Sequence, residues 1–284
     1  MTVVVTGATG HLGRLVVEHL LADGTAPGQI VATGRNTGRL AELAEQGVRT
    51  AAVAYDDAAG LDAAFAGADV LVLVSGSEVG QRVPQHAAAI DAARRASVGR
   101  VVYTSAPHAD TSDLLLVPEH RETERLLRES GLAWTILRNN WYSENYLGTL
   151  DQARQTGVVL TSTGTGRVAS AARDDYAAAA AVVAVGTGHE GRVYELSGDV
   201  AWTFDDFAAT AADVLGRPVE HRSVSGDQQA AILREAGLDE GTVGFVVGLD
   251  AGIARGDLAD ATADLRTLIG RPTTPLADTL AASL

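Results

Sequence analysis

Short apolar runs alternate with amphipathic stretches along the first 140 residues of the chain. Short continuous apolar runs predict strands, and apolar residues spaced three and four apart predict helices. The predicted strands are 3–5, 30–33, 48–53, 70–74, 100–104 and 134–137, and the predicted helices are 12–20, 39–46, 61–65, 83–96 and 119–130. Val70–Val74 is wholly apolar, as expected of a parallel strand that helices cover on both faces. The pattern predicts an α/β fold with a doubly wound parallel sheet.

Beyond residue 140 the apolar positions follow a less regular pattern. They predict helices at 176–185, 204–215, 227–236, 242–253 and 260–269, and a strand at 193–196. Neither an internal repeat nor a low-complexity linker marks a boundary between the two halves. We expect residues 1–140 to form the sheet domain. Residues 141–284 are expected to form a smaller α+β lid over the carboxyl edge of the sheet, interleaved with that domain.

Three glycines, at positions 7, 10 and 13, separate the first predicted strand from the first predicted helix. In a dinucleotide-binding turn of this spacing, the first glycine permits the tight turn and the second lets the backbone approach a pyrophosphate. The third glycine allows close packing of helix and strand. A plain structural turn is the alternative, but the position between a strand and an amphipathic helix favours a Rossmann-type dinucleotide site.

The residues after the second predicted strand indicate which dinucleotide binds. An acidic residue there would bind the ribose 2′-hydroxyl of NAD, but this chain has Gly34-Arg35-Asn36. The arginine fork matches a 2′-phosphate in charge and geometry, so we expect NADPH as the cofactor. A solvated loop arginine is the alternative. Asp56, after the third predicted strand, is either a partner for the adenine amino group or an ordinary turn residue.

Composition excludes several kinds of chemistry. The formal net charge of −14 and the absence of a basic run argue against nucleic acid as a partner. The chain has no cysteine, which excludes disulfides, thiolate catalysis and cysteine-ligated metals, and we expect no metal site. All 22 basic residues are arginines, so no mechanism that needs a lysine is available. A GC-rich genome accounts for the bias against lysine.

The chain shows no targeting or membrane segment. A strand begins at Val3 without a charged segment before it, which argues against a signal peptide. The longest apolar run, Ala177–Val185, is too short to span a bilayer. We therefore expect a cytoplasmic protein without a membrane span, and we leave a homodimer open.

Several longer strings resemble a known family. Thr6–Gly13 is similar to the NmrA-like group of atypical short-chain dehydrogenases/reductases. Other strings resemble the NAD(P)H:quinone oxidoreductase type 2 branch of that group. They are 77–82 with 84–86, 103–105, 108–112, 137–139 with 141–146, 169–171, 175–179, 189–191, 194–196 and 269–274. The resemblance extends over nearly the whole chain.

The resemblance implies a flavin-free enzyme that reduces a quinone with NADPH. It also implies the cofactor-binding residues, which are Gly7, Ala8, Thr9, Gly10, His11, Leu12, Arg35, Ser75, Gly76, Ser77, Asn139, Asn140, Trp141, Tyr142, Ser143 and Glu144. The stretch 139–144 is expected beside the nicotinamide, and Ser170–Tyr176 near the mouth of the site.

The sequence departs from the larger short-chain family, whose members use a tyrosine and a lysine four residues later. Tyr103 is followed at that spacing by Pro107, and His120 occupies the position of a lysine found in some NmrA-like reductases. Hydride reduction of a ketone makes a strongly basic alkoxide, which needs a tuned acid. A quinone gives a hydroquinone anion of phenolate-like basicity, so orientation and a few hydrogen-bond donors suffice.

Polar side chains near the ends of the fifth and sixth predicted strands are the candidate donors to a quinone. We expect catalytic roles for His120, Asn140 and Tyr142. Ser105 and Asn139 are further candidates, and His86 and His108 are weaker ones because surface or structural histidines are more common. Trp141, Tyr142 and Tyr146 either stack on a flat ring or pack in the core of the lid. The main alternative to an enzyme is an NADP-sensing regulatory protein without turnover, whereas a sugar epimerase or dehydratase is disfavoured by the missing Tyr–Lys pair.

Overall fold

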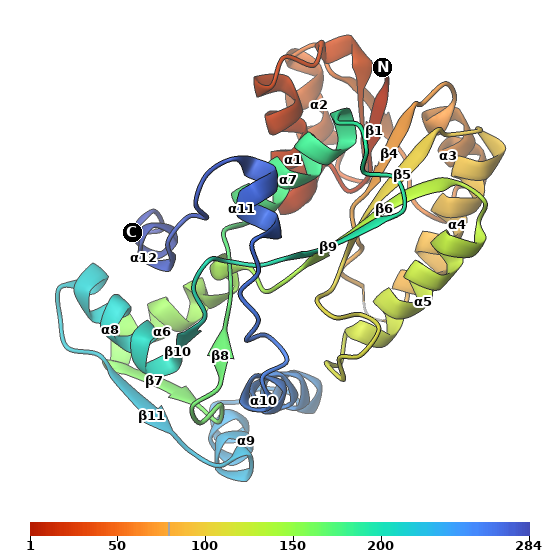
Figure 1. The fold of residues 1–284 in the computed structure, drawn as a ribbon. Helices are drawn as coiled ribbons and strands as arrows, with labels where there is room; N and C mark the ends of the chain where they lie inside the picture. The colour runs from red at the N-terminus through yellow and green to blue at the C-terminus, as the bar shows by residue number, and fades with distance from the viewer. Residues whose placement is uncertain (79) are drawn as a thin grey trace.

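The computed structural model describes residues 1–78 and 80–284, so Val79 of the string 77–82 lies outside the described residues. Its centre is a seven-stranded parallel sheet of order β3-β2-β1-β4-β5-β6-β9 (Figure 1). The strands are β1 (Val3–Val5), β2 (Ile30–Gly34), β3 (Arg49–Ala52), β4 (Val70–Leu73), β5 (Arg100–Ser105), β6 (Ala133–Asn139) and β9 (Arg192–Leu196). The strand order reverses between β1 and β4, where open α/β sheets bind ligands. The predicted doubly wound sheet is confirmed.

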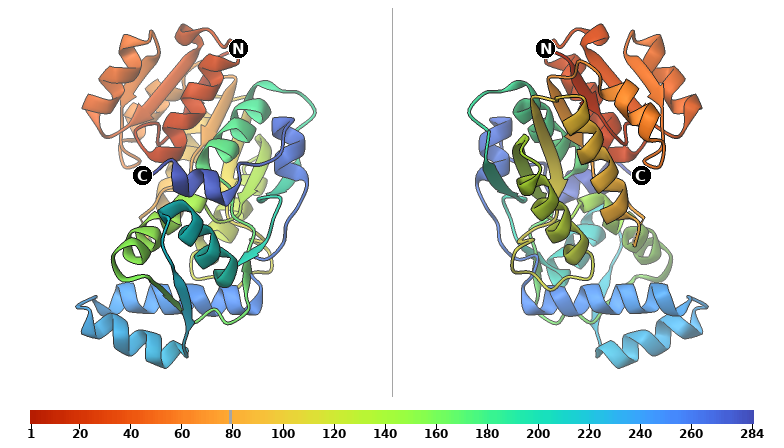
Figure 2. Two further views of the ribbon diagram at one scale, coloured as in Figure 1. Left: turned by 90° about the vertical axis from the view of Figure 1, so that its left-hand side faces the viewer. Right: turned by 90° about the vertical axis from the view of Figure 1, so that its right-hand side faces the viewer.

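Helices cover both faces of this sheet (Figure 2). One face packs against α1 (His11–Ala22), α2 (Thr37–Glu45), α7 (Arg173–Val185) and α11 (Asp264–Ile269). The other face packs against α3 (Ala58–Phe65), α4 (Arg82–Arg95) and α5 (Val117–Glu129). Val3 and Val5 belong to the first core and Val4 to the second, as the alternation of side chains along a strand requires.

The smaller C-terminal region lies at the carboxyl side of the sheet and has two short sheets of its own (Figure 1). In one, β7 (Val158–Thr161) pairs in parallel with β11 (Glu220–Ser223); in the other, β8 (Arg167–Val168) pairs antiparallel with β10 (Trp202–Thr203). The helices of this region are α6 (Leu147–Thr156), α8 (Phe204–Leu215), α9 (Gly226–Glu235), α10 (Glu240–Arg255) and α12 (Leu276–Ala281). A short 3-10 helix at Ser143–Tyr146 precedes α6, and another, at Pro27–Gln29, lies before β2 in the first half of the chain.

Aromatic side chains fill the core of this region. The rings of Tyr146, Trp202, Phe204 and Phe207 are all buried and lie in edge-on or tilted contact, with centroids 5.0–6.0 Å apart. The structure therefore places Tyr146 in the core of the lid. Meanwhile β9, α7 and α11 return from the second half of the chain to the central sheet. The boundary between residues 140 and 141 stays a prediction.

Two expectations for the second half differ from the structure. Helix α6 was not predicted, because its sequence has only two buried side chains, Leu150 and Ala153, and hence no apolar stripe. The helix expected at 260–269 begins only at Asp264. The preceding residues are irregular, and among them Thr262 donates its N–H to Ser197 Oγ at 2.7 Å instead of to a helical carbonyl. Among residues 1–78 and 80–284, none of the helices combines the length and apolar character that crossing a membrane requires.

Candidate active site

A cavity of about 1120 Å³ opens at the carboxyl ends of β1, β2, β3 and β4. The loops after these four strands, parts of α1, α3 and α4, and two residues from the second half of the chain form its wall. The lining comprises Thr6, Gly7, Thr9–Gly13, Thr33–Arg35, Val53–Asp56, Ala58, Leu61, Val74–Glu78, Gln81, Pro84, Gln85, Ala88, Tyr142 and Arg173. The structure thus brings together the glycine turn, Arg35, the segment Ser75–Ser77 and Tyr142. Six other predicted cofactor residues do not line the cavity: Ala8, Asn139, Asn140, Trp141, Ser143 and Glu144.

The glycine turn has the geometry of an anion site. Gly7 adopts a φ of +61°, and Gly10 N–H donates to Gly7 O at 2.8 Å, which closes the turn. A Cβ at Gly13 would lie 2.4 Å from Gly7 O, so only glycine permits this approach of helix to strand. Helix α1 begins directly after Gly10 without a side-chain cap. Its first N–H groups and positive dipole end therefore face the cavity without a side-chain competitor. Ala8 is buried, and its N–H donates to Thr33 O at 2.9 Å.

Two arginines stand where the second strand reaches the cavity. Arg35 Nη2 lies 2.8 Å from Glu78 Oε1, and its side chain is 72% exposed. Arg39, in the first turn of α2, donates from Nη1 to Thr9 O at 2.7 Å, so its guanidinium contacts the glycine turn. The hydrogen bond from Gln85 and the contact with Arg35 lower the pKa of Glu78. Neither Arg39 nor Glu78 was predicted from the sequence; for Arg39 the available signal was its position four residues, about one helical turn, after Arg35.

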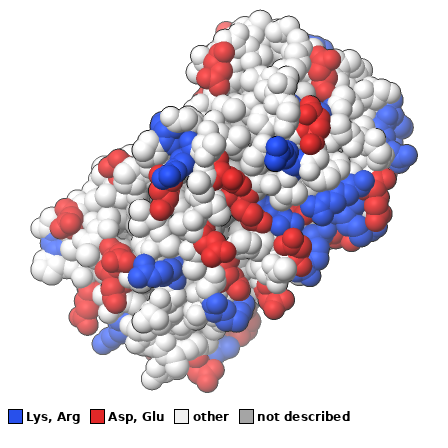
Figure 3. Space-filling view, viewed as in Figure 1, with Lys and Arg blue, Asp and Glu red and all other residues white. Residues whose placement is uncertain are grey.

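Basic and acidic side chains are interspersed on the face of the molecule shown in Figure 3. With a net charge of −14, the protein as a whole repels an anion. Binding of a phosphate at this cavity depends on local donors, namely the α1 N-terminus and the two arginines. After β3 the cavity is lined by Tyr55 and by the exposed Asp56, and a contact of Asp56 with adenine stays a prediction. Tyr55 was also missed, although an aromatic residue directly after the third strand was a usable signal.

His86 holds the segment after β4 in place. Gly76 N–H donates to His86 Nε2 at 3.1 Å, and His86 Nδ1 lies 3.0 Å from Thr123 Oγ1. Because Thr123 Oγ1 donates its own hydrogen to Glu119 O, Nδ1 carries the imidazole hydrogen and Nε2 is the acceptor. Burial, assisted by the nearby Arg82 guanidinium, lowers the pKa of His86 to about 3. The neutral ring thus positions the wall of the cavity.

His120 forms a buried pair with Tyr103. Tyr103 Oη lies 2.8 Å from His120 Nδ1, and neither residue lines the cavity. Burial raises the pKa of Tyr103, whereas burial, together with Arg82 and His86, lowers the pKa of His120 well below its usual value. Both groups are therefore neutral near pH 7.

Tyr142 is the residue of the stretch 139–144 that reaches the cavity. Asn139 Nδ2 donates to Tyr142 Oη at 3.3 Å, and Arg173 Cζ lies 5.2 Å from the centroid of the tyrosine ring. The ring of Tyr176 packs edge-on at 5.3 Å. Burial raises the pKa of Tyr142, although the hydrogen bond from Asn139 and the charge of Arg173 oppose this shift. Asn139 Oδ1 is buried and has no hydrogen-bond partner among the described residues.

The neighbours of Tyr142 build the wall behind it. Asn140 is buried; its Oδ1 accepts from Trp141 N–H at 2.7 Å, and its Nδ2 donates to Leu258 O at 3.3 Å. Ser143 Oγ lies 2.9 Å from Ser170 Oγ. The Glu144 carboxylate accepts from the backbone N–H of Arg173, the first residue of α7. These contacts fix where Tyr142 points.

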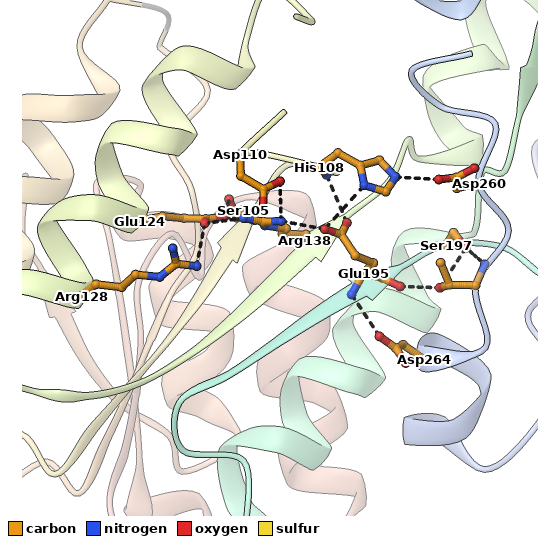
Figure 4. A network of polar contacts seen from close by, with 11 residues as sticks. Ser105, His108, Asp110, Glu124, Arg128, Arg138, Glu195, Ser197, Asp260 and Asp264 are labelled. Carbon is orange, nitrogen blue, oxygen red and sulfur yellow. Dashed lines mark hydrogen bonds and ion pairs between the residues drawn. The ribbon is translucent and has the colours of Figure 1, made fainter. Parts of the chain in front are cut away.

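Ser105 and His108 belong to a polar network at the ends of β5, β6 and β9 (Figure 4). Arg138 makes two hydrogen bonds to the Glu124 carboxylate, at 2.9 and 2.8 Å, and a third to Glu195 at 2.8 Å. Ser105 Oγ donates to Glu124, and His108 N–H donates to Glu195. Among the described residues neither side chain reaches the cavity, so both act within this network.

Comparisons with known proteins agree with the site. A family described as NAD(P)H-binding matches residues 7–185, which include the glycine turn, Arg35 and Tyr142. The chain belongs to this family. Quinone oxidoreductase 2 of Escherichia coli (strain K12) is 46% identical over 279 residues, covering 98% of this chain and 97% of that protein. The resemblance of this NAD(P)H-binding protein to the quinone oxidoreductase type 2 branch is confirmed.

Solved structures of the family extend over the same length. The NADPH-dependent quinone oxidoreductase QOR2 from Escherichia coli, complexed with NADPH, has a TM-score of 0.95, with 99% of each chain covered. The triphenylmethane reductase of Citrobacter sp., complexed with NADP(H), is 34% identical with a TM-score of 0.94, and 100% of each chain is covered. The relatives of this chain thus include a quinone oxidoreductase and a triphenylmethane reductase.

Proposed function

We propose that this protein is an NADPH-dependent quinone oxidoreductase that passes a hydride directly to a quinone, without a flavin. The observation that carries the proposal is the cavity itself. Its wall contains the glycine turn, the basic residue Arg35 and a neutral phenol, Tyr142. The resemblance of the whole chain to Escherichia coli quinone oxidoreductase 2 supports the same assignment.

The residues present fit NADPH. The uncapped start of α1 suits the pyrophosphate, and Arg35 with Arg39 suits the 2′-phosphate. Asn139, expected beside the nicotinamide, does not line the cavity itself; its Nδ2 donates to the oxygen of Tyr142, which does. When bound, NADPH supplies the hydride. The further contacts from Ser75–Ser77 and from the stretch 139–144 stay part of the proposal.

Tyr142 is suited to donate a hydrogen bond to a quinone oxygen. Asn139 Nδ2 donates to the phenol oxygen, which leaves the phenol hydrogen available for the substrate. Because burial raises the pKa of Tyr142, the hydroxyl stays protonated at neutral pH. It stabilises developing charge on the quinone and orients the ring, and the product anion takes its proton from water.

His120 and Asn140 stay predicted catalytic residues, and their contacts specify what each does. The hydrogen-bonding groups of the Asn140 side chain are used by Trp141 and Leu258, so its contribution is to position Tyr142. His120 contacts Tyr103, whose ring packs 5.4 Å from that of His86, the residue that holds Gly76 in the cavity wall. We therefore assign direct contact with the quinone to Tyr142 and positioning roles to the other two.

NADPH absorbance followed in the presence of several benzoquinones and naphthoquinones tests the proposal. We expect quinone-dependent loss of NADPH above the uncatalysed background, and no flavin absorbance in the purified protein. Tight NADPH binding without acceleration by any quinone would overturn the assignment and favour an NADP-sensing regulatory protein.

Localisation in the cytoplasm and assembly into a homodimer also stay predictions. Light scattering after size exclusion, with and without NADPH, measures the mass of the particle. A mass near 29.3 kDa would contradict the dimer.

A further inference from the structure

Arg173 projects into the end of the cavity where Tyr142 lies. It is the first residue of α7, and its backbone N–H is held by the Glu144 carboxylate at 2.9 and 3.1 Å. Its guanidinium lies over the Tyr142 ring, with Cζ 5.2 Å from the ring centroid. The guanidinium and the phenol therefore share one wall of the cavity, and a flat ring beside Tyr142 also lies beside Arg173.

The charge of this guanidinium is not balanced by a carboxylate. Its hydrogen-bond partner is the neutral amide of Asn145, with Nη2 to Oδ1 at 2.8 Å, and the described residues include no carboxylate within ion-pair distance of it. Nearby acidic groups are engaged elsewhere. The Glu144 carboxylate accepts from the backbone N–H of Arg173 and makes no ion pair with its guanidinium. Asp174 contacts His19 at 2.7 Å, and Asp175 contacts Arg271 at 2.7 Å.

The other arginine of the cavity differs in this respect. Arg35 is paired with Glu78 at 2.8 Å. In a protein of net charge −14, an arginine that lines a cavity without a carboxylate partner creates a local positive potential. A guanidinium without a counter-charge is suited to an anion that exists only during the reaction.

Reduction of a quinone creates such an anion. One C–H bond of NADPH breaks, its hydrogen and electron pair pass to the quinone, and NADPH becomes NADP+. One quinone oxygen gains an O–H bond and the other becomes a phenolate oxygen, which later takes a proton from water. Preorganised positive charge beside an oxygen that becomes negative lowers the barrier more than it favours the neutral substrate.

We propose that Arg173 is a catalytic residue of this site, whose guanidinium stabilises the phenolate oxygen of the hydroquinone anion as it forms. Tyr142 donates a neutral hydrogen bond, and Arg173 supplies the charge. This inference rests on the proposed quinone reduction, because it assigns the anion to the quinone. It predicts that the site prefers a phenolate over the corresponding neutral compound, independently of turnover.

An equilibrium measurement tests the anion preference without catalysis. The probe is 4-nitrophenol, whose phenolate absorbs visible light, titrated into the protein with NADP+ present at several pH values. We expect the bound phenol to ionise at lower pH in the unaltered protein than in Arg173→Gln. Removing a charge-assisted contact is expected to weaken phenolate binding about 10- to 100-fold. Binding of nitrobenzene, which has no ionisable oxygen, should change little.

Steady-state rates provide the second readout. Arg173→Gln should lower kcat by about 10²–10³-fold, as does loss of one oxyanion donor in other enzymes, and Arg173→Lys should recover part of the loss. The loss should grow for quinones whose hydroquinones are weaker acids. The matched control is Arg154→Gln, an exposed arginine on α6 that pairs with Asp151 and lies outside the cavity lining. It should leave both readouts unchanged.

The outcomes separate this inference from the proposed function. Full activity and full phenolate affinity in Arg173→Gln, with an unchanged melting temperature, would overturn the role of Arg173 and leave quinone reduction standing. Weaker NADPH binding with unchanged phenolate binding would overturn it too, because it would assign the arginine to the cofactor. If no quinone is reduced, the proposed function fails, and with it the catalytic role of Arg173. A phenolate preference that depends on Arg173 would in that case still show that the cavity binds a phenolate through this guanidinium.

Discussion

Arg35 Nη2 lies 2.8 Å from Glu78 Oε1, so the guanidinium predicted to bind the 2′-phosphate already holds a carboxylate. The pair is exposed, 72% for Arg35 and 41% for Glu78, and an exposed ion pair contributes about 0–1 kcal/mol. A phosphate dianion therefore displaces Glu78 at small cost, but it then shares Arg35 with a nearby carboxylate. Gln85 Nε2, which donates to Glu78 at 3.0 Å, keeps that carboxylate close.

Replacing Arg35 by Ala should remove most of the preference for NADPH over NADH. Loss of a charge-assisted contact to the phosphate is expected to weaken NADPH binding by about 1.5–3 kcal/mol, with little effect on NADH. Calorimetric titration of both cofactors measures the difference. Arg49→Ala, an exposed arginine on β3 outside the cavity lining, is the control. Equal affinities of the unaltered protein for NADPH and NADH would contradict this prediction.

Glu78→Gln should act in the opposite direction. The amide keeps the size of the side chain but removes the charge that competes with the phosphate for Arg35. We expect NADPH affinity to rise by no more than a few-fold, and the gain to fall with added salt because both groups are exposed. Titration with adenosine 2′-monophosphate and adenosine 5′-monophosphate isolates the effect, since only the former carries the 2′-phosphate. An equal gain for both nucleotides would show that Glu78 acts on the cavity as a whole.

Two glycines of the turn should respond differently to substitution. A Cβ at Gly13 meets the backbone of Gly7 at 2.4 Å, so Gly13→Ala should lower stability by about 1–3 kcal/mol as well as weaken binding. At Gly10 the nearest atom is Gly7 O at 3.2 Å, and the backbone φ of −91° suits valine. Gly10→Val should therefore weaken NADPH binding with a smaller loss of stability. Urea unfolding and NADPH titration of both variants give the comparison, and equal losses of stability would refute it.

The first half of the fold was predictable because its signals are local. Each of the six apolar runs predicted as strands between residues 3 and 137 is a strand of the sheet, and three glycines within seven residues identify the glycine turn. Arg35 was located by the same logic, since it follows directly after a strand. Such features depend on residues that are adjacent in the sequence. A residue directly after a predicted parallel strand is also expected at the carboxyl edge of the sheet.

The rest depends on contacts between distant segments. The pairing of β7 with β11 joins residues about 60 positions apart, and neither strand has an apolar alternation strong enough to mark it. Asn140 was a candidate donor by its position after β6, but the carbonyl of Leu258, far along the chain, uses its amide. Arg173 lies over Tyr142 because α7, of which it is the first residue, packs against the central sheet. No local pattern contains that information.

The ion pair between Arg138 and Glu124 is buried, with side chains 5% and 3% exposed (Figure 4). Glu124→Gln should destabilise the protein by about 3 kcal/mol, the lower end for a broken buried pair, because Glu195 still faces Arg138. Glu122→Gln on the same helix is the matched control, since Glu122 forms an exposed pair with Arg125. That control should cost less than about 1 kcal/mol. Urea unfolding curves that coincide for the two variants would contradict the prediction.

The last prediction concerns acid and His86. Its pKa is about 3 in the folded protein, because the ring is buried, and near 6.5 in an unfolded chain. Above pH 6.5 the ring is neutral in both states, and the stability that depends on its neutrality is fully present. Between pH 6.5 and 3 the unfolded chain binds a proton that the folded protein does not. Stability should therefore fall by about 1.4 kcal/mol for each pH unit from this group alone.

Urea unfolding at pH 7, 6 and 5 measures this slope before most carboxylates take up protons. His86→Gln is the test variant, because its side-chain oxygen is able to accept from Gly76 N–H but does not titrate. The variant should be less stable at pH 7, since the contact with Thr123 is altered, and its stability should fall less steeply towards pH 5. His120, whose pKa is also lowered by burial, contributes the remaining slope in both proteins. Equal slopes for the two proteins would mean that His86 is not held neutral in the fold and that another group supports the loop at Gly76.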